Sequence, residues 1–284
     1  MKTLKEILIP SSSQEVNEKI GICLSGGGAL GFAHIGVLKA LEDQRIFPQY
    51  VSGVSMGSII GSLYAAGYKP EQMLKMIKDG KLYKVTKLMN FQPAFWKSGL
   101  SNHSSFLTMM KELIPNNSFE KLEKKMHVCV TNLTTGNWEI IDTSNKLDIW
   151  VAASCSIPGL FNAMKINDNI YVDGGLLNNM PAQSLREKCT VIIGSDVISH
   201  SLSKKNQKSR DTLISSIRVM THQNSMQGRA LCDFVIEPKS IERFHEFSYD
   251  SYESIYQFGY RETIQYIAEH PDILRLQKPI ESEY

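Results

Sequence analysis

The chain has 284 residues, of which 42% are hydrophobic, and its 31 Lys and Arg residues against 29 Asp and Glu residues give a formal charge of +2. A chain of this length buries about three quarters of its unfolded surface when it folds, which excludes disorder over most of the molecule. The nearly balanced charge argues against nucleic acid as a partner, and no feature of the sequence indicates an oligomeric state.

Length alone is compatible with one domain or two, because α/β folds of about 250 residues are often single domains. We expect one domain over residues 20–270, an N-terminal extension at 1–19 and a C-terminal tail at 271–284. The N-terminus carries Lys2, Lys5 and Glu6 and has no apolar run typical of a signal peptide. The five cysteines are scattered and predict free thiols in a reducing compartment, with no zinc site and a cytoplasmic location.

The first predicted elements form two strand–loop–helix units. Ile20–Leu24 is a short apolar run typical of a buried strand, and an apolar-periodic helix follows a glycine turn at about Phe32–Glu42. In the second unit, a strand at Tyr50–Ser52 leads through a sharp turn at Gly53–Ser55 into a helix at about Met56–Ala66.

These two units also form two windows without charge, Ile20–Leu38 and Ile46–Tyr68. Each exceeds the roughly 18 residues that suggest a transmembrane helix. The glycines at 26–28 and Pro48 argue against a continuous helix, because an exposed glycine break leaves backbone groups unsatisfied in hydrocarbon. We therefore expect buried α/β structure and no membrane span.

Residues 81–97 combine four lysines with aromatic and aliphatic side chains. This composition suits a lid or an interfacial patch that meets anionic lipid. A connecting segment packed on the domain explains it equally well, and the sequence leaves both interpretations open.

Further strands and helices alternate along the rest of the chain. Such alternation predicts an α/β fold with a mainly parallel sheet and helices on both faces. The predicted strands are His127–Asn132, Trp138–Asp142, Thr190–Ser195 and Asp233–Glu237, and the predicted helices are Ser104–Ile114, Leu147–Ser154, Ala182–Glu187, Thr212–Gln227 and Ser251–Ala268.

The G-x-S-x-G motif at Gly53–Gly57 has the context that the motif requires, a strand before it and a small-residue helix after it. Gly53 and Gly57 leave room for a strained turn that exposes the oxygen of Ser55 at a helix N-terminus. The N–H of Met56 would then point to where negative charge develops on a reacting carbonyl. Ser55 is the candidate nucleophile.

The run Gly26-Gly27-Gly28-Ala29-Leu30-Gly31 also fits the dinucleotide fingerprint G-x-G-x-x-G. That fingerprint expects an acidic residue at the end of the second strand, and this strand runs instead into the Ser55 turn. A glycine loop that presents backbone N–H groups beside a serine nucleophile is better explained as an oxyanion hole.

The base that would activate Ser55 is less evident. His34 is the one histidine near either glycine motif, but it lies inside the helix after the loop, where a packed histidine is the common case. Asp173 stands before Gly174 and Gly175 at a predicted strand end. An Asp-Gly pair can also be a simple hairpin turn, so the residues alone leave its role open.

Four ordered blocks closely resemble the patatin-like phospholipases, especially the compact bacterial type. The resemblance extends, with looser stretches, from about Ile20 to Tyr266. The blocks are S-G-G-G-A-L-G-F-A-H-I-G-V-L at 25–38, G-V-S-M-G at 53–57, A-S-C-S-I-P-G-L-F at 153–161 and Y-V-D-G-G-L-L-N-N-M-P at 171–181.

The resemblance implies a three-layer α/β/α fold with a nucleophile elbow and a Ser/Asp dyad, in which Ser55 attacks and Asp173 is the base. A free carboxylate is a weak base, so burial and a hydrogen bond to Ser55 would have to assist it. No histidine, cofactor or metal is then required. The implied oxyanion donors are Gly26, Gly27, Gly28 and Met56, and the motif glycines that support them are Gly31, Gly53, Gly57, Gly174 and Gly175.

The implied function is that of a serine lipid acyl hydrolase of the phospholipase A or lysophospholipase type, which acts in lipid breakdown or remodelling and contacts a membrane peripherally. An acyltransferase, a catalytically silent patatin-like binding protein and, remotely, a dinucleotide-binding protein are the alternatives. One departure matters: many members carry Arg or Lys two residues after the triple glycine, where this chain has Leu30. A phosphate contact assigned to that cation is therefore in doubt.

Overall fold

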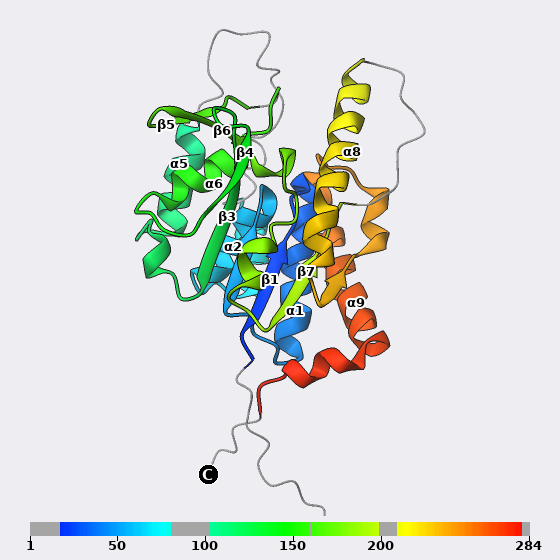
Figure 1. Cartoon of the computed structure of the whole chain (residues 1–284). Coiled ribbons are helices and arrows are strands. Elements are labelled where there is room, and N and C mark those ends of the chain that lie inside the picture. The colour runs from blue at the N-terminus through cyan, green and yellow to red at the C-terminus, as the bar shows by residue number, and fades with distance from the viewer. Residues whose placement is uncertain (1–17, 81–102, 160, 199–208, 280–284) are drawn as a thin grey trace, which may run out of the picture.

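The computed structural model describes residues 18–80, 103–159, 161–198 and 209–279. A twisted sheet lies at the centre, with helices packed around it (Figure 1). Within these residues the sheet has eight strands in the order β5-β6-β3-β2-β1-β7-β8, and β4 pairs with β3. The strands are β1 (Ile20–Leu24), β2 (Tyr50–Gly53), β3 (Lys125–Asn132), β4 (Asn137–Ile141), β5 (Met164–Ile166), β6 (Asn169–Asp173), β7 (Val191–Ser195) and β8 (Phe234–Ile236).

The five strands β3, β2, β1, β7 and β8 run parallel to one another, whereas β4 and β6 pair antiparallel with β3. β5 forms an antiparallel hairpin with β6. The helices are α1 (Phe32–Asp43), α2 (Met56–Ala65), α3 (Pro70–Lys78), α5 (Ser104–Leu113), α6 (Leu147–Ser154), α7 (Gln183–Arg186), α8 (Ser209–Ala230) and α9 (Tyr252–Glu269).

Strand β1 shows how the two faces of the sheet are covered. Ile20, Ile22 and Leu24 join the large core that α1, α2 and α9 build on one face. Cys23 points the other way, into a smaller cluster with Leu185 of α7. Because side chains alternate along a strand, β1 sends residues to both faces of the sheet, and both faces are buried. The three-layer fold with a mainly parallel sheet, as predicted, is confirmed.

The two charge-free windows fold as β1 with α1 and as β2 with α2, and their lack of charge follows from burial in the core. The predicted elements are present with ends shifted by three residues at most. Helix α3 and strand β5 are additions to the prediction, whereas β6 is the strand whose end was predicted at Asp173. Ile273 and Leu276, in the stretch expected to be a tail, lie in a 3-10 segment (Pro271–Leu276) and are buried in the large core.

The strand register brings three segments to one edge of the sheet. Leu24, the last residue of β1, pairs with Gly53 of β2, and Gly53 pairs with Val128 of β3. Two residues farther along β3, Val130 pairs with Asp173 of the antiparallel strand β6. The glycine loop after β1, the Ser55 turn and Asp173 therefore meet at the carboxyl ends of the parallel strands.

Candidate active site

Ser55 lies in a sharp turn between β2 and α2, with φ 53° and ψ −126°. A positive φ is uncommon for a residue other than glycine and costs roughly 1–3 kcal/mol, so its surroundings must hold it in place. A Cβ on Gly53 would lie 2.4 Å from the carbonyl oxygen of Gly57, and one on Gly57 would lie 2.3 Å from that of Leu24. Both positions therefore require glycine, because another part of the backbone lies in contact with each of them.

Hydrogen bonds made by buried serine side chains hold the Ser55 turn in place. The N–H of Ser55 donates to Oγ of Ser154 at 2.9 Å, and that hydroxyl donates to the carbonyl of Cys129 in β3 at 2.7 Å. On the helix side, Oγ of Ser58 donates to the carbonyl of Ser55 at 2.7 Å. Ser154 was not predicted as a site residue, although it stands in the A-S-C-S-I-P-G-L-F block that carried the family resemblance.

Asp173 ends β6 and caps the 3-10 turn that follows (Gly174–Leu176), its Oδ1 accepting the N–H of Gly175 at 2.8 Å. The residue does not form the hairpin turn that an Asp-Gly pair suggests. Burial raises the pKa of the Asp173 carboxyl from 3.8 to about 6, while hydrogen bonds from the Ser55 side chain and the N–H of Gly175 act to lower it. The carboxyl therefore sits next to Ser55 with a basicity well above that of a free aspartate.

The glycine loop is held against the segment that precedes α9. The N–H of Ala29 donates to the carbonyl oxygen of Glu246 at 2.9 Å, and a Cβ on Gly28, which has φ 56°, would lie 2.5 Å from that same oxygen. Among the residues that the structure describes, none accepts a hydrogen bond from the N–H of Gly26, Gly27 or Gly28. These donors are available to a ligand.

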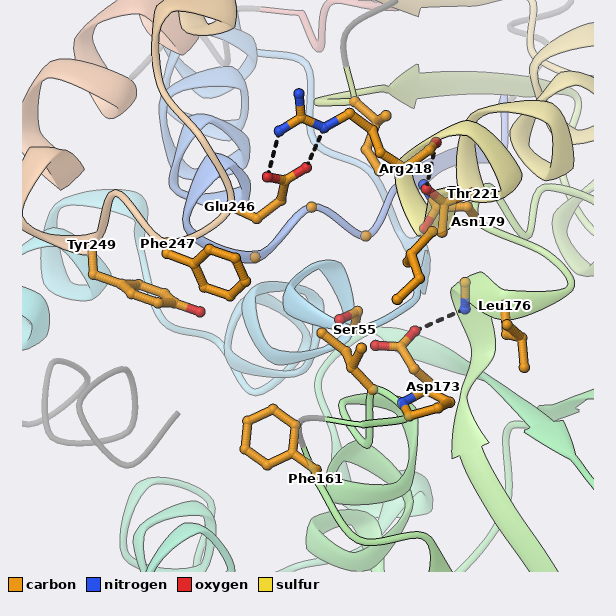
Figure 2. Close-up of a pocket in the computed structure, with 18 residues that line it drawn as sticks. Ser55, Phe161, Asp173, Leu176, Asn179, Arg218, Thr221, Glu246, Phe247 and Tyr249 are labelled. Atoms are coloured by element: carbon orange, nitrogen blue, oxygen red, sulfur yellow. Dashed lines mark hydrogen bonds and ion pairs between the residues drawn. The ribbon is translucent and has the colours of Figure 1, made fainter. Parts of the chain in front are cut away.

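A pocket of about 950 Å³, a volume that includes open solvent at its mouth, joins these parts (Figure 2). It contains six of the residues predicted for the site, together with apolar side chains and one ion pair. Its lining consists of Gly26, Gly27, Gly28, Ser55, Ile157, Pro158, Phe161, Asp173, Gly175, Leu176, Asn179, Ile198, Ile217, Arg218, Thr221, Glu246, Phe247 and Tyr249. In Figure 2 the Asp173 carboxyl faces Ser55, and Phe161 lies on the opposite side of Ser55 from Arg218.

The remaining predicted residues lie behind this pocket. Met56 does not line it; its side chain is buried under Gly31, where a Cβ would lie 2.3 Å from Cγ of Met56. Gly174 is pressed against β3, where a Cβ would lie 2.4 Å from the carbonyl oxygen of Cys129. Met56 can contribute its backbone N–H at the start of α2.

His34 is fully buried away from the pocket and is held at both ring nitrogens. Nδ1 lies 2.8 Å from Oγ of Ser195, and Nε2 lies 2.9 Å from the carbonyl oxygen of Ser25. Burial lowers the pKa of His34 to about 4, which favours the neutral ring. The packed histidine expected from the sequence is what the structure shows, and it ties the glycine loop to β7.

Asn179 is a pocket residue that the sequence analysis did not single out. Its side-chain oxygen fills the space that a Cβ would need on Gly26 or on Gly175, at 2.5 and 2.6 Å. Its Nδ2 is buried and has no hydrogen-bond partner in the described part of the chain. Asn179 thus joins the glycine loop to the turn after Asp173, and its place in the Y-V-D-G-G-L-L-N-N-M-P block was the signal that could have found it.

The structure also bears on metal binding and on membrane crossing. No group of three His, Cys, Asp or Glu side chains in the described ranges is arranged to hold a metal ion, and none of the described helices is long and apolar enough to cross a bilayer. The lysine- and aromatic-rich segment 81–97 lies outside the described residues, so its two interpretations stay predictions.

The chain is similar to a known protein family and to several known proteins. The family model for patatin-like phospholipases matches residues 22–186, more than half of the chain. The chain is 29% identical over 186 residues to the lysophospholipase NTE1 of Yarrowia lipolytica, covering 63% of this chain and 13% of that protein. It is 31% identical over 172 residues to NTE1 of Cryptococcus neoformans, covering 60% of this chain and 10% of that protein.

A bacterial relative is an uncharacterized NTE family protein of Mycobacterium bovis, 27% identical over 163 residues, which cover 57% of this chain and 44% of that protein. Among solved structures, VipD from Legionella pneumophila aligns with a TM-score of 0.48 and 15% identity, over 93% of this chain and 72% of that one. The chain thus spans only a small part of the fungal relatives that it matches.

Proposed function

Since this chain belongs to the patatin-like phospholipase family, we propose that it is a serine lipid acyl hydrolase that cleaves carboxylic ester bonds, with Ser55 as the nucleophile and Asp173 as the base. The observation that carries the proposal is that Ser55 and a buried carboxyl, whose pKa is raised to about 6, face each other in one pocket. Such a carboxyl is still ionised at neutral pH, and it is a stronger base than an exposed aspartate.

The first half of the reaction transfers the acyl group to the enzyme. As Oγ of Ser55 attacks the ester carbonyl carbon, its proton passes to the Asp173 carboxylate. Negative charge develops on the carbonyl oxygen, and the N–H groups of Gly27, Gly28 and Met56 stabilise it. The tetrahedral intermediate then expels the alcohol, which takes the proton from Asp173, and an acyl ester of Ser55 remains.

The second half releases the fatty acid. Asp173 takes a proton from a water molecule as the water oxygen attacks the acyl carbon, and collapse of the intermediate returns a proton to Oγ of Ser55. An alcohol in place of water would give the acyltransferase alternative. The apolar side chains of Ile157, Pro158 and Phe161 near Ser55 support an acyl chain as the group that the pocket holds.

Labelling with a fluorophosphonate, combined with hydrolysis of a chromogenic acyl ester, tests this proposal. The wild-type chain should label and hydrolyse. Ser55→Ala should lose both properties, and Asp173→Asn should lose at least 100-fold in rate, within the range for removal of a general base. A chain that neither labels nor hydrolyses any acyl ester is the catalytically silent alternative. Retained hydrolysis in Asp173→Asn would contradict the dyad.

We also propose peripheral contact with a lipid surface, from which the substrate would be drawn. Leu133 and Ile170 are 49% and 44% exposed and adjacent, since the N–H of Leu133 donates to the carbonyl of Ile170 at 2.8 Å. Apolar side chains exposed together favour such contact. Equal sedimentation of the wild type and of Leu133→Glu/Ile170→Glu with vesicles would contradict it. The cytoplasmic location stays a prediction.

A further inference from the structure

One ion pair stands in the wall of the pocket that contains Ser55. Arg218 of α8 meets Glu246 side-on, with Nε 2.6 Å from Oε1 and Nη2 2.6 Å from Oε2. Both side chains line the pocket, and each is about one fifth exposed. Figure 2 shows the pair on the far side of Ser55 from Phe161, so that the pocket has a charged end and an apolar end.

The Glu246 carboxylate is not what holds the glycine loop. The loop is bound through the Glu246 backbone, whose carbonyl oxygen accepts the N–H of Ala29 at 2.9 Å. The side-on geometry also uses only Nε and Nη2 of Arg218, and nothing in the described ranges accepts a hydrogen bond from Nη1. A guanidinium has five N–H donors in a planar fork, so Arg218 can bind an anion while it keeps Glu246.

The position of the pair matters because the rest of the pocket offers little charge. Among its lining residues, the other carboxyl is Asp173, which is engaged with Ser55, and the described lining holds no Lys or second Arg. The position two residues after the triple glycine is occupied by the uncharged Leu30. Arg218 supplies a cation to the same pocket from a distant part of the chain.

We propose that Arg218 and Glu246 form a head-group subsite that selects a zwitterionic phospholipid head group, with the phosphate on Arg218 and the ammonium group on Glu246. This inference rests on the proposed function, because it assigns the alcohol side of the ester to the charged end of the pocket. A zwitterion satisfies both partners without adding net charge, whereas an anionic head group meets repulsion from Glu246. The aromatic ring of Phe247, which Figure 2 shows next to Glu246 in the lining, suits the ammonium end.

Binding of single-chain ligands without an ester tests the subsite independently of hydrolysis. The probes are dodecylphosphocholine, monododecyl phosphate and 1-O-dodecylglycerol, each titrated below its micellar concentration into the full chain. We expect the wild type to bind the phosphocholine about tenfold more tightly than the other two. The dodecylglycerol lacks the phosphate that would accept a charge-assisted hydrogen bond from Arg218, and the dodecyl phosphate lacks the quaternary ammonium group that the charge of Glu246 and an aromatic ring attract; each such interaction contributes about this factor.

The variants separate the two charges. Arg218→Gln should lose the preference for phosphate-bearing ligands over dodecylglycerol, and Arg218→Lys should retain part of it. Glu246→Gln should weaken binding of the phosphocholine and tighten binding of the dodecyl phosphate, so that the order of these two ligands reverses. Arg243→Gln and Glu242→Gln are matched controls, because both residues are exposed, lie a few positions before Glu246 and do not line the pocket.

A purely structural ion pair predicts a different result. The Arg218→Gln and Glu246→Gln variants would then weaken all three ligands alike, or leave the affinity ratios within about threefold of those of the wild type, and either outcome overturns the subsite. Fluorophosphonate labelling of Ser55 in the same preparations reports on the proposed function by itself. Labelling without head-group selectivity refutes only the subsite, and selectivity without labelling refutes only the hydrolase.

Discussion

At the scale of single residues, the site depends on two side chains that are held in costly states. Ser55 has a left-handed backbone conformation, and Asp173 is a carboxyl that is only 6% exposed. The Ser154 hydroxyl offsets the first cost by accepting the N–H of Ser55, and the N–H of Gly175 offsets part of the second. Costs of this kind are typical of catalytic sites, where geometry and basicity are maintained at the expense of stability.

The raised pKa of Asp173 gives a pH dependence for the reaction. In the proposed mechanism Asp173 must be deprotonated to accept the proton of Ser55, so kcat/KM for a neutral acyl ester should be level above about pH 7. It should fall below pH 6, the region to which burial raises the pKa. A pH profile of hydrolysis from 4.5 to 8 measures this, and a midpoint near 4 would show that burial does not perturb the carboxyl in the working enzyme.

The same shift predicts how stability depends on pH. The pKa of the Asp173 carboxyl is higher in the folded state than the ordinary 3.8, so the folded protein binds a proton at Asp173 more tightly than the unfolded chain does. This proton binding stabilises the fold at low pH, and the stabilisation is lost as the pH rises toward about 6. Asp173→Asn carries no charge and should therefore stabilise the protein at pH 7, by at most about 3 kcal/mol. Thermal unfolding of both proteins at pH 7 and pH 4 checks the sign: the difference in Tm should shrink at pH 4.

At the scale of elements, glycines allow backbone segments of the sheet and helices to touch. A Cβ on Gly57 of α2 would lie 2.3 Å from the carbonyl oxygen of Leu24 and 2.6 Å from that of Ser25. Where the two helices α1 and α9 pack together, a Cβ on Gly36 of α1 would lie 2.2 Å from the carbonyl oxygen of Tyr256 in α9. The composition of the charge-free windows thus reflects contacts between elements.

A pair of substitutions on the same helix separates close contact from helix propensity. Gly57→Ala should destabilise the protein by about 3 kcal/mol or more and abolish activity, because the carbonyls of β1 cannot move away. Gly61→Ala, one turn later in α2, meets the side-chain ends of Met126 and Val51 at 3.0 Å, which can shift, and it gains helix propensity of up to about 1 kcal/mol. Chemical denaturation measures both; equal losses would contradict the argument.

At the scale of the whole molecule, the sheet order gathers the site from distant stretches of chain. The pocket draws on the glycine loop after β1, the turn after β2, the end of β6, helix α8 and the segment before α9 (Figure 1). The C-terminal segment supports this arrangement from the side of the large core, where Ile273 and Leu276 pack. The N–H of Lys278 donates to the carbonyl of Arg45 at 3.0 Å.

Truncation therefore tests where the folded unit ends. A chain that stops at His270 should lose about 3–6 kcal/mol of unfolding free energy, since two buried aliphatic side chains are removed. A chain that stops at Pro279 keeps both side chains and should unfold like the full chain. If the shorter chain is as stable as the longer one, residues 271–284 form the separate tail that the sequence suggested.

How much of the fold and of the candidate site could be predicted from the sequence depends on whether the signal for each feature was local. Periodicity and turn residues predicted β1, α1, β2 and α2 nearly to the residue, because each signal lies within its own element. Helix α3 was missed although Pro70 at its start and Met73 and Ile77 on its buried face were such signals. The three-residue strand β5 is only half buried and gave none.

The sequence by itself determined the fold class, the strained turn at Ser55, the glycine loop and the family, because these rest on residue types at fixed short spacings. Only the tertiary structure decided which groups meet. It placed Asp173 against Ser55 through an antiparallel strand and the Ser154 hydroxyl against the N–H of Ser55. It also gave the buried His34, expected from the sequence, its partner Ser195, and brought Arg218 and Glu246 into the pocket wall. Burial, pKa and ion pairing arise from contacts between residues far apart in the chain, and no short window of sequence contains them.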